Sequence, residues 1–571
     1  MKWGPQPLAD GGTRFSIWAP GVEALTLEIE GAAPIAMTAT ADGWFEGDTT
    51  AAPGAHYRFV LSDGQSVPDP ASRAQAGDVH GWSIIPAPDS YRWTNADWRG
   101  RPWREAAVQE VHVGTLGGYA GVADRLADIA ALGFTAIELM PLATCGGTRN
   151  WGYDGVLPYA PTAAYGGPDN LKALIDAAHG HGLMVLLDVV YNHFGPDGNY
   201  LPAYAPDFFK ADLHTPWGGA IDFQREAVAR FFIDNALYWL GEFRFDGLRL
   251  DAVHAIGDDA FLDRLAGEVR GAFPDRHVHL VLENEHNDAG KLDGAYDAQW
   301  NDDFHNVMHV LLTGEEHGYY RDFAEAPAEK LAQCLAEGFI YQGQGSPNQK
   351  GRARGMPSAH LSPIRFVSFL QNHDQIGNRA LGERLTLLTD AARLRAATGL
   401  LLLCPQIPLT FMGDETGSES PFLFFTDFHD ELADAVREGR RGEFAAFPGF
   451  SDPQARAAIP DPNARATFEQ SRPEPGPDAA AWRTLYAELL GLRHAHIVPA
   501  LDDAEALGAA AIGERAVRAQ WRLGARVLTI ALNLGDAPVA VDLPNGAPLA
   551  VVGDAPAGGT IPPAAFAAWL S

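Results

Sequence analysis

Residues 244–254 read RFDGLRLDAVH, a stretch with an apolar, strand-like pattern in which Arg249 and Asp251 lie two residues apart. Side chains of an extended chain alternate between two faces, so Arg249 and Asp251 share one face and Leu248 and Leu250 share the other. A buried ion pair usually adds little net stability. From this stretch alone, a structural role and a functional role are both open.

Seven further short apolar runs occur in the central part of the chain and alternate with amphipathic segments, the pattern of repeated βα units. The eight runs, in order, contain VQEVHVG, FTAIELMPL, LMVLLDVVYNH, GLRLDAV, VHLVLENE, AQWN, IRFVSFLQNHD and IPLTFMGDE. Helical periodicity between them is clearest in VADRLADIAALG, DNLKALIDAAHGHG, REAVARFFIDNALYWLGEF and DAFLDRLAGEVRGAF. Eight such units predict an α/β fold, a (β/α)8 TIM barrel.

Segments with strand periodicity flank this barrel on both sides. Leu25, Leu27 and Ile29 alternate with polar residues, which predicts an N-terminal β-sandwich. A Pro-, Trp- and Gly-rich segment over 67–102 predicts the connection to the barrel. Alternation returns in AVRAQWRLGARVLTIALNL, which predicts a C-terminal antiparallel β domain. The predicted domains are 1–100 (β-sandwich and linker), 101–497 (catalytic barrel) and 498–571 (C-terminal β domain).

Composition limits the partners. The 571 residues include 42 Lys and Arg against 73 Asp and Glu, a formal net charge of −31. Such a chain would be repelled by nucleic acid and by an anionic bilayer, so we expect neither as a partner. Cys145, Cys334 and Cys404 are too few and too scattered for a zinc cluster, and we expect no metal and no cofactor. The N-terminus lacks a signal-peptide pattern and no apolar run is long enough to span a bilayer, so we expect a cytoplasmic protein.

Polar residues gather at the C-terminal ends of the predicted barrel strands, where a parallel barrel has its open face. Each ionised group on such apolar strands costs several kcal/mol to desolvate unless it is paired, so function explains several of them better than packing does. The residues at these ends are Asp188, Asn192, His193, Asp251, Glu283, Glu285, His373 and Asp374.

Several converging carboxylates, without a metal or cofactor motif, suit glycosidic bond cleavage. One carboxylate attacks the anomeric carbon, and a second carboxyl group protonates the leaving oxygen. Arg249 would lower the pKa of a nucleophilic Asp251, whereas acidic neighbours in a partly apolar cleft would raise the pKa of the acid. His193 and His373 could donate to sugar hydroxyls or make structural hydrogen bonds. Asp188, together with Asn192 and His193, could instead bind calcium.

The segments DVVYNH, GLRLDAVH, LENE and FLQNHD, in this order, resemble the four signature regions of the α-amylase superfamily, glycoside hydrolase family 13. The resemblance implies Asp251 as nucleophile, Glu283 as acid/base and Asp374 as transition-state stabiliser. It further implies a set of residues around the sugar in the −1 site, with Tyr153 stacked under that sugar. This set is Asp188, Asn192, His193, Arg249 and His373.

Some assignments stay open at the level of the residues. Glu283 and Glu285 are two positions apart, so strand alternation places both on one face and does not choose the acid, although the family register favours Glu283. Trp300 is expected to offer a flat ring to a sugar. His254, three residues after the nucleophile, is expected to face the +1 sugar.

Asp302 and Asp303 fit either of two roles. They could contact the terminal sugars, or they could form a solvated pair in a loop.

Within the superfamily, three stretches are similar to the malto-oligosyltrehalose trehalohydrolases: VPDPASRAQAGDVHGWS, YDAQWNDDFHNVMHVLLTGEEHGYYRDF and PFLFFTDFHDELADAVREGRRGEFAAFP. This similarity implies a retaining glycoside hydrolase that cleaves the α-1,4-glucosidic bond next to the terminal trehalosyl unit of malto-oligosyltrehalose and releases trehalose. One alternative is an α-1,4-glucan branching enzyme or a general α-glucan hydrolase. Another is a non-catalytic glycan-binding protein. Because all three implied catalytic positions carry carboxylates, an enzyme is favoured.

Overall fold

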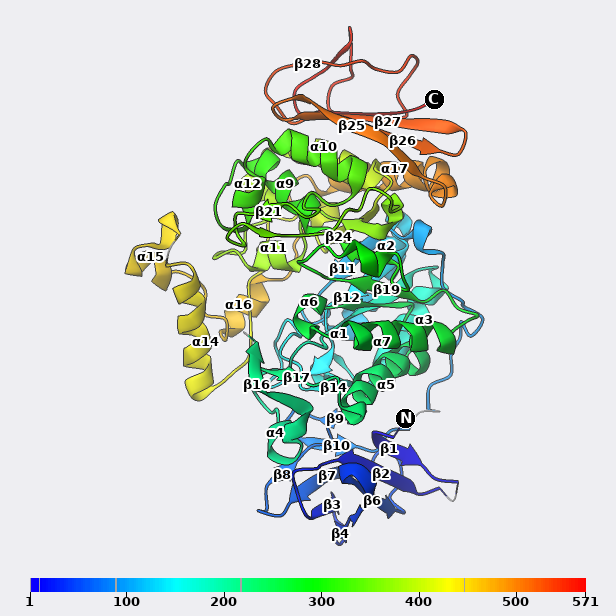
Figure 1. Ribbon diagram of the computed structural model, residues 1–571, viewed down its shortest axis with the longest axis vertical. Helices are drawn as coiled ribbons and strands as arrows, with labels where there is room; N and C mark the ends of the chain where they lie inside the picture. The colour runs from blue at the N-terminus through cyan, green and yellow to red at the C-terminus, as the bar shows by residue number, and fades with distance from the viewer. Residues whose placement is uncertain (1, 10, 88–89, 216–217, 446) are drawn as a thin grey trace.

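The computed structural model describes residues 2–9, 11–87, 90–215, 218–445 and 447–571. Three regions follow one another along the long axis of the molecule: an N-terminal β region at one end, a barrel in the middle and a C-terminal sheet at the other end (Figure 1). A helical excursion projects from one side of the barrel (Figure 1). It contains α14 (Asp430–Glu443), α15 (Pro453–Ala457) and α16 (Arg465–Gln470).

Two antiparallel sheets form the N-terminal β-sandwich. One has the strand order β1-β2-β6-β5, and the other has the order β4-β3-β7-β10-β9 with β8 paired to β7. Their bounds are β1 Gly4–Pro7, β2 Thr13–Trp18, β3 Leu25–Ile29, β4 Ile35–Ala36, β5 Thr38–Ala39, β6 Trp44–Thr49, β7 His56–Leu61, β8 Ser66–Val67, β9 Gln75–Ala76 and β10 Trp82–Ile84. The predicted connection over 67–102 is wrong in its first part, because β9 and β10 extend the second sheet. Strands of two or three residues are too short to show a period.

Eight parallel strands close into the predicted barrel, in the order β11-β12-β15-β18-β19-β20-β23-β24. Each of the eight predicted runs supplies one strand, so the fold class is confirmed. The bounds are β11 Val108–Val111, β12 Ala136–Leu139, β15 Met184–Val189, β18 Gly247–Leu250, β19 His279–Leu282, β20 Ala298–Trp300, β23 Phe366–Ser368 and β24 Ile407–Phe411.

Helices surround the barrel because each buries an apolar face against the strands. The longer ones are α3 Pro168–Gly180, α5 Glu226–Glu242, α7 Asp259–Ala272, α9 Asp302–Thr313, α10 Pro327–Glu337, α13 Ala391–Leu403 and α17 Ala479–His496. The predicted helix in VADRLADIAALG is divided into α1 (Gly118–Ala123) and α2 (Leu126–Leu132).

The barrel interior changes character along the strands. An apolar layer fills the lower part and consists of Val108, Ala136, Met184, Leu186, Val281, Ala298, Val367, Ile407 and Leu409. Inward-facing positions recur every second residue, so the next inward positions on β11, β12, β15 and β18 form a polar layer above it. The polar layer consists of Glu110, Glu138, Asp188 and Arg249, all 2% exposed or less. On these four strands the inward-facing charged side chains therefore lie towards the C-terminal ends.

An antiparallel five-stranded sheet ends the chain, with the order β25-β26-β27-β31-β29, and β28 pairs with β30 beside it. The bounds are β25 Glu505–Gly513, β26 Ala516–Leu523, β27 Arg526–Asn533, β28 Val539–Ala540, β29 Ala550–Val552, β30 Thr560–Ile561 and β31 Ala565–Leu570. Within the described ranges, no helix has the length and apolar character needed to cross a membrane.

Candidate active site

Arg249 lies at the centre of the polar layer and joins two strands. Its Nη1 donates to both carboxylate oxygens of Asp188, at 3.0 and 2.8 Å, and to Oδ1 of Asp251 at 2.7 Å. Arg249 and Asp251 therefore do share a face, as the strand alternation predicts. The buried charge pair of residues 244–254 is part of a triad in which one guanidinium binds two carboxylates at the open end of the barrel.

Trp300, expected from the sequence to contact a sugar, lies inside the barrel. Its side chain is 1% exposed, and the guanidinium carbon of Arg249 lies 4.1 Å from the centre of its ring. A cation over an aromatic face is favourable when both are desolvated. Trp300 therefore packs against Arg249 inside the barrel, and the ring expected to offer a platform to a sugar is buried there.

The backbone turns sharply at Ala252, directly after Asp251. Ala252 has φ 42° and ψ 49°, a left-handed conformation that is uncommon for residues with a Cβ atom. In this conformation its N–H donates to Oε2 of Glu283 at 2.6 Å, and the N–H of Val253 donates to the carbonyl of Glu283 at 3.0 Å. The unfavourable turn thus holds Glu283 beside Asp251, as is common for strain at functional sites.

Glu283 has the environment expected of a proton donor. Burial raises its pKa well above the ordinary value against the opposing charge of Arg249, and the negative charges of Asp251, Asp302 and Asp374 raise it further. The carboxyl group therefore favours its protonated form.

Glu285 lies in a different environment, although alternation would place it on the same face as Glu283. Its side chain is 58% exposed, and its carboxylate is 3.9 Å from Nε2 of His254. Alternation fails because β19 ends at Leu282, and the side chain of Asn284 accepts a hydrogen bond from the N–H of His286, which bends the chain.

Tyr153 links two of the predicted residues by its hydroxyl group. Its Oη lies 2.6 Å from Oδ2 of Asp188 and 2.8 Å from Nε2 of His373, and its ring stacks on that of His373 at 5.2 Å between centroids. Asp374 follows at the start of α11 (His373–Gly377), where its Oδ2 lies 3.4 Å from Nε2 of His373. The side chain of Asp374 is 42% exposed and open to a ligand.

Three further predicted residues border this cluster. Asn192 is buried, and within the described part of the chain neither side-chain amide atom has a hydrogen-bond partner. His193 Nε2 lies 2.9 Å from the carbonyl of Tyr153. His254 is half-buried, with Nδ1 positioned to accept from the N–H of Glu285 at 3.4 Å. The calcium hypothesis is disfavoured, since both oxygens of Asp188 already bind Arg249.

Two buried glutamates in this cluster were missed by the sequence reasoning. Glu110 contacts His373 through both oxygens: Oε2 accepts from the backbone N–H at 3.1 Å, and Oε1 is hydrogen-bonded to Nδ1. Glu138 lies opposite Glu110 in the β11–β12 register. The signal was available, because each is the one charged residue in its short strand, VQEV and AIEL.

Comparison with known proteins shows the family of the chain. The family model for the α-amylase catalytic domain matches residues 61–207, and that of a domain of unknown function, DUF3459, matches residues 504–568. A malto-oligosyltrehalose trehalohydrolase of Deinococcus radiodurans is 42% identical over 507 residues, which cover 86% of this chain and 83% of that protein. The chain belongs to the malto-oligosyltrehalose trehalohydrolase family. Another trehalohydrolase, from Saccharolobus solfataricus, is 39% identical over 472 residues, which cover 80% of this chain and 82% of that protein.

A solved structure supports the same placement. A crystal structure from Salmonella typhimurium, described as a candidate α-amylase, superposes with a TM-score of 0.94 at 45% identity and covers 100% of this chain and 99% of that one. The resemblance to the trehalohydrolases and to the α-amylase superfamily is thereby confirmed.

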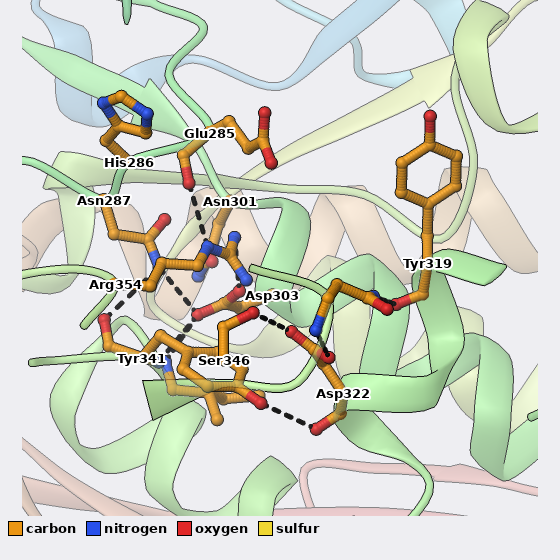
Figure 2. Close-up of polar contacts among 12 residues, drawn as sticks. Glu285, His286, Asn287, Asn301, Asp303, Tyr319, Asp322, Tyr341, Ser346 and Arg354 are labelled. Carbon is orange, nitrogen blue, oxygen red and sulfur yellow. Dashed lines mark hydrogen bonds and ion pairs between the residues drawn. The ribbon is translucent and has the colours of Figure 1, made fainter. Parts of the chain in front are cut away.

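In this member of the trehalohydrolase family, a buried ion pair ties the loop after Glu283 to a distant segment. Asp303 is 0% exposed, and its Oδ1 lies 3.0 Å from Nη2 of Arg354. Its Oδ2 accepts from Asn287 at 2.9 Å and from the backbone N–H groups of residues 340 and 341. Arg354 also donates from Nε to the carbonyl of Glu285 at 2.9 Å (Figure 2). Asp303 is therefore not a solvated loop residue.

Asp302, the neighbouring residue at the start of α9, lies closer to the catalytic cluster. Burial raises its pKa to about 7 against the opposing charge of Arg354, and Asp374 adds to the rise. The two carboxyl groups have different environments, although the sequence presents them as a pair.

Asp303→Asn should destabilise the fold by about 3–5 kcal/mol, because it leaves the buried guanidinium of Arg354 without its counter-charge. Denaturant unfolding followed by circular dichroism measures this loss. Asp293→Asn is the matched control, because Asp293 pairs with His360 on the surface, where both side chains are more than half exposed, and such a pair contributes at most about 1 kcal/mol. Equal losses for the two variants would contradict the assignment.

Proposed function

We propose that this chain, a glycosidase of the α-amylase family, cleaves the α-1,4-glucosidic bond next to the terminal trehalosyl unit of malto-oligosyltrehalose and releases trehalose. The observation that carries the chemistry is the pairing of two carboxyl groups in opposite environments on neighbouring strands. Asp251 accepts from a buried guanidinium, whereas Glu283 is buried with a raised pKa. The relatives of the same family, which are named for this substrate, support the specificity.

In the proposed mechanism, Asp251 is the nucleophile. Its carboxylate attacks the anomeric carbon and forms a glycosyl–enzyme ester, while Glu283 donates its proton to the departing glycosidic oxygen. The first product, trehalose, then leaves. In the second step, Glu283 accepts a proton from a water molecule, which attacks the same carbon and releases Asp251. Two displacements retain the configuration at the anomeric carbon.

The surrounding side chains suit a sugar in the −1 site. Asp374 is exposed beside His373, where its charge would stabilise the positive charge that develops on the sugar ring. Tyr153 presents a half-buried ring, and Asn192 presents an amide without partners among the described residues. His254 lies beside the exposed side chain of Glu285, a position that suits a contact with the sugar in the proposed +1 site. The assignments of these residues remain proposals.

Product analysis tests the function. Maltoheptaose and its trehalose-capped counterpart are incubated separately with the protein, and products are separated by anion-exchange chromatography. We expect free trehalose from the capped sugar and no comparable hydrolysis of maltoheptaose. New α-1,6 branches would instead identify a branching enzyme, and shortened maltose chains from both sugars would identify a general α-glucan hydrolase.

A cytoplasmic location also remains a prediction from the sequence.

A further inference from the structure

His373 is enclosed by hydrogen-bond acceptors on both sides of its ring. Nδ1 is bonded to Oε1 of Glu110, and both residues are 1% exposed. Nε2 faces Oη of Tyr153 at 2.8 Å and Oδ2 of Asp374 at 3.4 Å. Glu110 also accepts from the backbone N–H of His373, so a single carboxylate fixes both the ring and the chain at this position.

The number of available protons defines the state of the ring. Tyr153 has one hydroxyl proton and two neighbours, Asp188 and His373. Asp188 accepts from Nη1 of Arg249 through both of its oxygens, which opposes the rise of its pKa to about 7 by burial, so above that pH it is a carboxylate and the acceptor for Tyr153. Nε2 of His373 must then donate, and Nδ1 must donate to Glu110. Both ring nitrogens carry hydrogen, which makes the ring an imidazolium.

On this geometry, and assuming the proposed hydrolysis, we propose that Glu110 is a positioning residue. It holds His373 as an imidazolium with Nε2–H directed to the side of Tyr153 and Asp374. The charged ring keeps Asp374 oriented at the −1 site and lets the hydroxyl proton of Tyr153 remain on the bond to Asp188. Glu110 itself lies in the buried polar layer and acts on the sugar site indirectly, by holding His373.

The electrostatics agree with this assignment. Burial by itself lowers the pKa of His373, but the charges of Glu110 and Asp374 outweigh burial and raise it to about 9. Other titratable or charged groups also face the ring from the surrounding elements. These are His112 on the segment after β11, Glu138 on β12, Tyr153 before β14 (Leu157–Pro161), Asp188 on β15 and Arg249 on β18. The positive charge of Arg249 lowers the pKa of His373, and the charge of Glu110 makes the largest contribution that raises it.

Glu110→Gln should move the alkaline limb of the kcat/KM profile to lower pH by about 1–3 units, the range expected when one close opposite charge is removed. The direction follows because a buried imidazole without its counter-charge loses its proton at lower pH. Activity lost at pH 8 should therefore be recovered as the pH falls towards 6. Glu110→Asp, which keeps the charge, should keep the alkaline limb near its wild-type position even if the shorter side chain lowers kcat.

Glu138→Gln is the matched control. Glu138 is the register partner of Glu110, and burial raises its pKa well above the ordinary value, so its carboxyl group favours the uncharged form. An amide there should not move the alkaline limb. If it moves the limb as far as Glu110→Gln does, the effect belongs to any buried amide in the barrel and the proposal fails.

A double-mutant cycle tests whether Glu110 acts through His373. Glu110→Gln should lower kcat/KM at pH 8 by about tenfold or more in the wild-type background and by much less in a His373→Asn background. Equal losses in both backgrounds would refute the proposal.

Nitrogen NMR of the ¹⁵N-histidine-labelled protein reads the ring directly, with His373→Asn used for assignment. We expect both nitrogens protonated at pH 7 in wild type and a neutral ring in Glu110→Gln. A neutral His373 in the wild type overturns the proposal. This measurement is independent of turnover, so it distinguishes failure of the proposal from failure of the trehalose-releasing function, which the product analysis tests.

Discussion

Asp251→Asn should lower kcat by about 10⁴-fold or more on a trehalose-capped malto-oligosaccharide, since removal of a nucleophile removes the covalent route itself. Affinity for the oligosaccharide should stay close to that of the wild type. The amide oxygen can still accept the hydrogen bond from Arg249, and Arg249 keeps both of its bonds to Asp188. Single-turnover kinetics measures the chemical step, and isothermal titration calorimetry measures binding.

The two measurements together separate catalysis from folding. Asp293→Asn, an exposed carboxylate outside the cluster, serves as the control and should retain wild-type turnover. Should Asp251→Asn lose binding and unfold at lower denaturant concentration, Asp251 would be a structural partner of Arg249 and the proposed mechanism would lose its nucleophile.

Glu283→Gln should reduce turnover of the same substrate by about 10²–10⁴-fold, whereas Glu285→Gln should retain most of it. Glu283 is held by the N–H of Ala252 and has a raised pKa, which suits an acid. Glu285 is largely exposed and lies beside His254. The pair is a matched test, because the two substitutions are chemically identical and two residues apart.

An activated substrate sharpens this comparison. An aryl glycoside with a good leaving group needs little protonation, so Glu283→Gln should cost far less on it than on the natural bond. Equal losses on both substrates would show that Glu283 does not act as the acid. The opposite ranking of the two variants on the natural substrate would transfer that role to Glu285.

Periodicity and strand ends predicted most of this fold. Each of the eight barrel strands lies within a run identified from apolar patterning, and the residue directly after β18, Asp251, lies where the open face was expected. Arg249 and Asp251 were placed on one face because alternation holds within a regular strand. Alternation failed for Glu285 because the strand had already ended at Leu282.

Other features depend on contacts that no local pattern encodes. Trp300 ends a strand of three residues, and its place under the guanidinium of Arg249 comes from barrel closure. The partner of Asp303 is Arg354, 51 positions further along, in a segment without strong periodicity. Glu110 lies on β11, which closes the barrel by pairing with β24, and its contact with His373 spans 263 positions.

The apolar layer beneath the polar layer has a consequence for the kind of molecule that can approach. The carboxylates lie between an apolar layer of low polarisability and the solvent at the open face of the barrel. Their electric field is therefore directed towards that open face. A hexose phosphate arriving there would meet repulsion, whereas an uncharged maltose chain would not, and a ring that gains positive charge would be drawn in. We therefore expect the site to bind neutral glucans in preference to phosphorylated sugars.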